Sequence, residues 1–117
     1  MKTKNRNMLS RTLTLLALSV LTLSVSRAVS AGKKYVVVQK GKSFSVAELH
    51  VKVGDVVEFR NEDDVSHNVF SVSKIQPFNT KMQTPGSDAA VTFTNAGTIE
   101  VRCAIHPGMK LKIQVAK

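Results

Sequence analysis

Three residues with sulfur or imidazole donor groups stand within seven positions near the end of this 117-residue sequence. They are Cys103, His106 and Met109, in the stretch Cys-Ala-Ile-His-Pro-Gly-Met. Thiolate and thioether sulfur suit Cu(I), whereas imidazole suits Cu(II), so a site that cycles between the two states needs both kinds of ligand. A trigonal set of two histidines and one cysteine, with a weak axial methionine, meets this need. The spacing therefore predicts a copper site that still requires a second histidine.

Of the two remaining histidines, His67 is the better candidate for this place. His50 alternates with the apolar residues Leu49 and Val51 and should therefore face water from the surface of a strand. His67 lies where a polar turn passes into an apolar strand. In a β-sandwich that turn can share one end of the domain with the loop that follows Cys103.

A second methionine, Met82, competes with Met109 for the axial position. The residues next to Met82 are polar and indicate an exposed loop, whereas Met109 opens an apolar strand. A lone histidine or methionine is more often structural than a ligand, so the combination of residues carries the prediction. The predicted metal ligands are His67, Cys103, His106 and Met109.

The first 31 residues have the pattern of a secretory signal peptide. Residues 1–11 carry basic and no acidic residues, Leu13–Val25 is an apolar run, and Ala28-Val29-Ser30-Ala31 offers small residues to a peptidase. A membrane anchor is the alternative, but this run is shorter than the roughly 20 residues that a spanning helix needs. We expect removal of residues 1–31 by cleavage after Ala31, with Ala28 as the alternative site, and export to the periplasm.

Residues 32–117 then form one domain of modest charge. The leader holds five of the 17 Lys and Arg residues and none of the eight acidic residues, so its removal lowers the net charge from +9 to +4. The remaining basic residues are interspersed along the chain, and no basic stripe carries stacking aromatic residues. We therefore expect that the protein does not bind nucleic acid. We also expect a monomer, with no membrane span once the leader is removed.

Cys103 is the single cysteine of the chain, so an internal disulfide cannot stabilise the domain. A free thiol in an oxidising compartment is open to oxidation. Either the thiol is buried and inert, the commoner case for a single cysteine, or something occupies it. The neighbouring imidazole and thioether groups favour a bound metal.

Short segments of alternating apolar and polar residues, separated by turn residues, predict an all-β domain. About seven to eight such strands are typical of an antiparallel Greek-key β-sandwich or barrel. Cys103 shares the parity of Ile99 and Val101, so its sulfur should point into the sandwich. A short helical turn near Lys74–Thr80 is limited by Pro77. The candidate strands are Tyr35–Gln39, Leu49–Val53, Val57–Phe59, Asn68–Val72, Val91–Phe93, Ile99–Cys103 and Leu111–Val115.

The chain resembles the small blue copper proteins, the cupredoxins, over nearly all of residues 32–117. The resemblance rests on Val53–Asn61, on His67-Asn68-Val69 and on Cys103–Met109. The two-residue gap between His106 and Met109 is similar to that of the amicyanins rather than to the longer gaps of plastocyanins and pseudoazurins. Ser66 and Gly108 depart from the amicyanin-like pattern, which has Pro and Phe there.

This resemblance implies a division of roles among the site residues. The two histidines would bind one copper ion through Nδ1 in a type 1 site, with the Cys103 thiolate and an axial Met109. The backbone N–H of Asn68 would donate to the Cys103 sulfur, which is the kind of outer contact that orients metal ligands. His106, flanked by Pro107 and Gly108, would be the exposed ligand near which partner proteins dock.

The function that follows is transfer of single electrons between redox proteins by transient docking, without enzymatic chemistry. Four protein ligands leave no strong open position for a substrate, unlike catalytic metal sites. The main alternative is a periplasmic protein that binds copper and delivers it to an acceptor. A sandwich with a buried thiol and no native metal is a third possibility, and zinc could occupy the same ligands.

Overall fold

The computed structural model describes residues 24–26 and 30–117, and all regular structure in them is β. Most of the predicted leader, including residues 13–23 of its apolar run, lies outside the described residues, so its removal stays a prediction. Within them no helix has the length and apolarity that crossing a membrane requires. The strands are β1 (Lys34–Lys40), β2 (Ser43–Phe44), β3 (Glu48–Lys52), β4 (Val56–Asn61), β5 (Val69–Ser71), β6 (Phe78–Asn79), β7 (Asp88–Thr92), β8 (Gly97–Cys103) and β9 (Lys110–Ala116).

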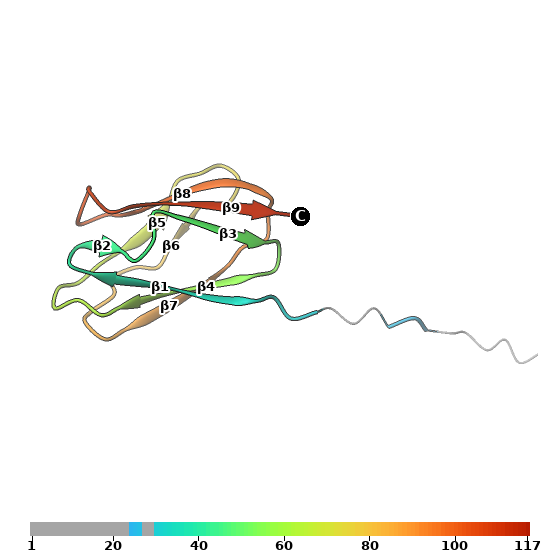
Figure 1. Cartoon of the computed structure of the whole chain (residues 1–117), viewed down its shortest axis with the longest axis horizontal. Coiled ribbons are helices and arrows are strands. Elements are labelled where there is room, and N and C mark those ends of the chain that lie inside the picture. Colours follow the sequence, from blue (N-terminus) through green and yellow to red (C-terminus); the bar gives the residue numbers. More distant parts are fainter. Residues whose placement is uncertain (1–23, 27–29) are drawn as a thin grey trace, which may run out of the picture.

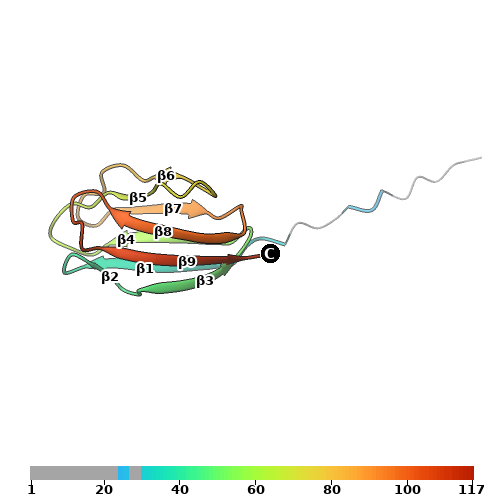
Figure 2. The same cartoon turned by 90° about the horizontal axis from the view of Figure 1, so that it is seen from above.

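Two sheets stack face to face as a sandwich (Figure 1, Figure 2). One sheet has the order β2-β1-β4-β7 and the other the order β3-β9-β8-β5-β6. The all-β sandwich is thus confirmed, but β1 pairs with β4 and β3 pairs with β9 in parallel, so both sheets are mixed rather than wholly antiparallel. The reason is topological. After β2 the chain crosses to the other sheet for β3 and returns for β4, which enters from the same end as β1.

All seven predicted strands are present, and two further strands were not predicted. β2 and β6 contain two residues each, too few to show an alternation in the sequence. β6 lies where a short helical turn was considered. Phe78 of this strand packs its ring against Phe59 and Phe93, with centroids 6.2 and 6.0 Å away. Packing of this partly buried ring against the core favours an extended segment over the helical turn.

The core consists of the inward residues of both sheets. In β8 from Ile99 onward and in β9, every second residue is buried and the residues between are exposed or half-buried, as the period of a strand requires. Phe59 lies at the centre, fully buried between the rings of Phe44 and Phe78 at 6.2 Å each. The buried core comprises Val37, Val51, Val57, Phe59, Val69, Phe93, Ile99, Val101, Leu111, Ile113 and Val115.

Three connections meet at one end of the sandwich, the left end in Figure 1. They are the β1–β2 turn, the segment between β4 and β5, and the loop between β8 and β9. The C-terminus and residues 30–33 lie at the opposite end. His67 and the Cys103–Met109 loop therefore share one end of the domain, as the strand pattern predicted.

Replacement of Phe59 by Ala should lower the free energy of unfolding by about 3–5 kcal/mol, because it leaves a cavity among rings that are already close-packed. Urea unfolding of the folded domain measures this change. Val72→Ala is the matched control, since Val72 is 80% exposed and should change the free energy by less than about 0.5 kcal/mol. Equal effects of the two substitutions would contradict the placement of the core.

Candidate metal centre

Strand β8 delivers Cys103 to the interior of the sandwich at its last residue. The side chain is 3% exposed, and the parity with Ile99 and Val101 is confirmed. Cys103 pairs with Val69 of β5, which brings the preceding residue, Asn68, over the sulfur. The backbone N–H of Asn68 donates to Sγ at 3.4 Å, the contact that the resemblance to cupredoxins implied.

The loop after β8 turns back within six residues and presents His106 at the surface. The N–H of Ala104 donates to the Asn68 carbonyl at 2.9 Å, and the N–H of Met109 donates to the His106 carbonyl at 3.0 Å. His106 is half-buried, whereas Pro107 and Gly108 beside it are exposed. Met109 is 1% exposed, so its side chain is directed into the protein under this loop.

His67 is the buried histidine. It is fully buried and lies between β4 and β5, where its backbone forms a two-way bridge with Gln83 at 3.0 and 2.7 Å. His50 has a 76% exposed side chain and contacts Glu48 on β3 at 2.9 Å, so it faces water as predicted. Met82 is 59% exposed, which agrees with the expected surface loop.

The donor atoms of three predicted ligands surround one point. Cys103 Sγ lies 3.7 Å from Nδ1 of His67 and 3.7 Å from Nδ1 of His106, and the two nitrogens are 3.1 Å apart. A point equidistant from the three atoms is about 2 Å from each, close to the ~2.0–2.3 Å bonds that zinc makes with imidazole and thiolate. Among the described residues this is the one His, Cys, Asp or Glu cluster with metal-site spacing. The donor set therefore fits a soft or borderline metal ion such as copper.

The Asp63 carboxylate, which was not predicted as part of the site, contacts the outer nitrogen of the His67 ring. Asp63 Oδ2 lies 3.0 Å from Nε2 of His67 and accepts the N–H of Lys42 at 2.9 Å. These contacts, the Lys42 N–H foremost, hold the pKa of Asp63 well below its usual range. The carboxylate therefore stays ionised at neutral pH and can only accept hydrogen bonds.

The buried side-chain amides of Asn61 and Gln83 form hydrogen bonds that restrain the segment carrying His67. These contacts were not predicted from the sequence. The amide group of Asn61 donates to the carbonyls of Val65 and Gln83 at 2.9 Å each, and its oxygen accepts the N–H of Asp63 at 2.9 Å. The side chain of Gln83 donates to the Phe59 carbonyl at 2.9 Å. The sequence signal was the polar residue Asn61 at an inward position of β4, which a strand tolerates only where it is hydrogen-bonded.

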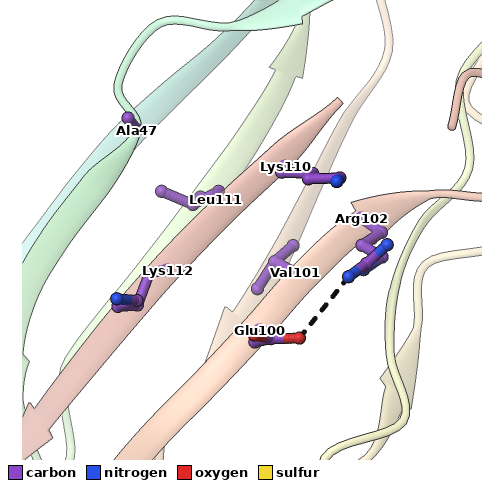
Figure 3. A pocket seen from close by; sticks show the side chains of 7 residues that line it. All are labelled: Ala47, Glu100, Val101, Arg102, Lys110, Leu111 and Lys112. Atoms are coloured by element: carbon purple, nitrogen blue, oxygen red, sulfur yellow. Dashed lines mark ion pairs between the residues drawn. The ribbon is translucent and has the colours of Figure 1, made fainter. Parts of the chain in front are cut away.

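A hollow of about 270 Å³ lies along strands β8 and β9, and none of the four proposed ligands lines it (Figure 3). The charged side chains of Arg102 and Lys110 stand beside it, with Glu100 joined to Arg102 at 3.6 Å. Arg102 and Lys110 are directly opposite each other in the register of β8 and β9. Arg102 immediately precedes Cys103, and Lys110 immediately follows Met109. This outer face is therefore basic close to the metal centre.

The sandwich, the buried thiol and the two converging imidazole nitrogens define a copper protein of the cupredoxin class. Residues 31–116 match the family described as copper binding proteins, plastocyanin/azurin family. The chain belongs to this family, and copper is its cofactor.

Individual relatives agree with this assignment. Amicyanin from Paracoccus denitrificans is 36% identical over 75 residues, which cover 62% of this chain and 57% of that protein. This chain thus spans little more than half the length of that relative. The methylamine utilization protein MauL from Methylorubrum extorquens is 31% identical over 111 residues, or 85% of this chain and 93% of MauL.

Solved structures show the same fold. A reduced mutant of amicyanin superimposes with a TM-score of 0.65 at 32% identity, covering 76% of this chain and 86% of that protein. A copper-containing nitrite reductase from Thermus scotoductus also gives a TM-score of 0.65 at 32% identity, but the match covers only 22% of that chain. The similarity to the reductase is therefore to one part of a much longer protein.

Substitution of Asn61 by Ala should destabilise the domain by about 1–3 kcal/mol, because it leaves buried carbonyls and the Asp63 N–H without partners. Thermal or urea unfolding of the protein without metal measures the loss. Asn95→Ala serves as the control, since its amide donates to the Ile75 carbonyl in an exposed setting. A loss no greater than that of the control would show that the amide network does not hold the His67 segment.

Proposed function

We propose that this protein carries single electrons between redox proteins, with one copper ion held by His67, Cys103, His106 and an axial Met109. The observation that carries the proposal is the meeting of three donor atoms around one point, at 3.1 to 3.7 Å from one another. The copper ion bound there supplies a reversible exchange of one electron between Cu(II) and Cu(I). The protein has to hold the ligands still and bring one of them to the surface.

The scaffold restrains the ligands on two sides. Cys103 ends a seven-residue strand that is paired on both edges, with β5 and with β9. His67 is fixed by its backbone bridge to Gln83 and by Asp63 at its outer nitrogen. Because these restraints do not depend on a metal, they favour a ligand geometry that changes little with oxidation state, which suits rapid electron exchange.

His106 provides the route to a partner in this proposal. It is half-buried, and exposed Pro107 and Gly108 and the 44% exposed Ile105 surround it with an uncharged rim. Arg102 and Lys110 lie close by and favour partners with acidic surfaces. Redox partners meet in small, short-lived interfaces, which such a rim can form.

The same geometry favours a carrier over an enzyme. Four protein ligands fill a type 1 copper site, whereas catalytic metal sites keep a position open for substrate. It also favours a carrier over a copper-delivery protein, because Cys103 is 3% exposed and His67 is fully buried. An acceptor thiol would reach the metal only after these ligands moved.

We also propose that the protein is exported to the periplasm after removal of residues 1–31. The charged start, the apolar run and the small residues before Gly32 support this. The match to the copper-binding family begins at residue 31, where cleavage is expected. The N-terminus of the protein purified from cells that export it would test the cleavage site.

Cys103→Ser should abolish the intense visible absorption of the copper-loaded protein, because the thiolate is the proposed source of that colour. Absorption and paramagnetic-resonance spectra, with metal analysis to exclude zinc, are the measurements. His50→Ala is the matched control and should leave both spectra unchanged. Loss of colour in the His50 variant instead would mean that His67 is not the second histidine.

Met109→Gln should keep copper bound and lower the reduction potential, since an amide oxygen is a harder donor than a thioether and favours Cu(II). Voltammetry of the copper-loaded variant provides the value. Met82→Gln is the control and should leave the potential as in the native protein. An unchanged potential in the Met109 variant would rule out Met109 as the axial ligand.

A further inference from the structure

Asp63 is the one carboxylate of the described residues that touches a proposed metal ligand. Its Oδ2 lies 3.0 Å from Nε2 of His67, on the side of the ring away from the copper position. The Asp63 side chain is 9% exposed and the His67 side chain is fully buried. This contact is therefore shielded from water and is stronger than a similar pair at the surface would be.

The direction of this hydrogen bond determines which ring nitrogen is available to a metal. An ionised carboxylate offers only acceptors, so Nε2 of His67 must carry the proton. In a neutral imidazole Nδ1 is then left with its lone pair, and Nδ1 is the atom that faces Cys103 Sγ at 3.7 Å. Asp63 thereby selects the tautomer that a metal ligand requires.

The carboxylate is held in place from several directions. The N–H of Lys42 donates to Oδ2 at 2.9 Å, and the N–H of Asp64 donates to Oδ1 at 3.1 Å. The N–H of Asp63 itself donates to Asn61 Oδ1 at 2.9 Å. Lys42 contributes its N–H from a turn with a φ of 54°, an unfavourable conformation for a residue with a side chain. These contacts restrain the carboxylate and, through it, the His67 ring.

We propose that Asp63 is a positioning residue of the copper centre, which fixes the His67 ring and adds a buried negative charge that favours Cu(II) over Cu(I). The inference rests on the proposed ligation by His67. Outer contacts of this kind contribute 10–100-fold to metal affinity in other sites. The Asp63 charge lies across one ring from the metal position, so it stabilises the doubly charged ion more than the singly charged one.

The test compares Asp63→Asn with Asp64→Asn. Both substitutions remove one negative charge from adjacent positions, but the Asp64 side chain is exposed and does not contact His67. In Asp63→Asn the affinity for Cu(II) should fall about tenfold more than that for Cu(I), which corresponds to a rise in reduction potential of about 59 mV. Zinc affinity of the metal-free protein should also fall about tenfold. Asp64→Asn should change each value by less than twofold.

A second measurement needs no variant that might fail to fold. In the zinc-loaded native protein the Nε2 proton of His67 should give a nuclear magnetic resonance signal that exchanges slowly with water. Rapid exchange there, or equal potentials and zinc affinities in the two Asn variants, would overturn the role of Asp63. If the native copper-loaded protein itself shows no intense visible absorption, that result would instead refute the proposed electron-carrier site.

Discussion

The Cys103 sulfur lies inside a hydrophobic sandwich and within 3.7 Å of two imidazole nitrogens, one from 36 residues earlier and one from three residues later. Burying three polar donors together costs free energy unless each is satisfied, so the arrangement requires strong support from the surrounding fold. The paired strands β5 and β8 supply part of it, because their register places Asn68 over the sulfur. The rest of the metal end can be understood as a means of keeping His67 opposite that sulfur.

The position of His67 opposite the sulfur depends on polar side chains with little apolar surface. Asn61 and Gln83 are buried, and they connect β4, the loop after β6 and the His67 segment through side-chain-to-backbone hydrogen bonds. Such buried polar contacts add little net stability, since on folding they replace hydrogen bonds that the same groups make to water in the unfolded chain. They are directional, however, and apolar packing is not. The hydrophobic core therefore stabilises the sandwich, and the amides determine how His67 is oriented within it.

The features visible in the sequence are those with a local signature. Alternation of apolar and polar residues was enough to find seven strands, the inward direction of Cys103 and the outward direction of His50. The ligand loop was visible because its three donors are close in sequence. The parallel pairing of β1 with β4 was not visible, because it depends on how the chain crosses between sheets. The contact of Asp63 with His67 was not visible for a similar reason: the carboxylate is anchored by the N–H of Lys42, which lies 21 residues away in the sequence.

The two histidines are chemically identical but differ in their surroundings, so only one side of the site reaches the protein surface. His67 is fully buried and has the Asp63 carboxylate at its outer nitrogen, so the position of its ring is restrained. His106 is half-buried in a loop closed by one hydrogen bond to Met109, and its outer edge faces an uncharged rim. In the proposed role, the shortest path for an electron from the metal to a partner therefore passes the His106 ring. A site with two equally buried histidines would protect the metal as well but would offer a partner no comparable contact.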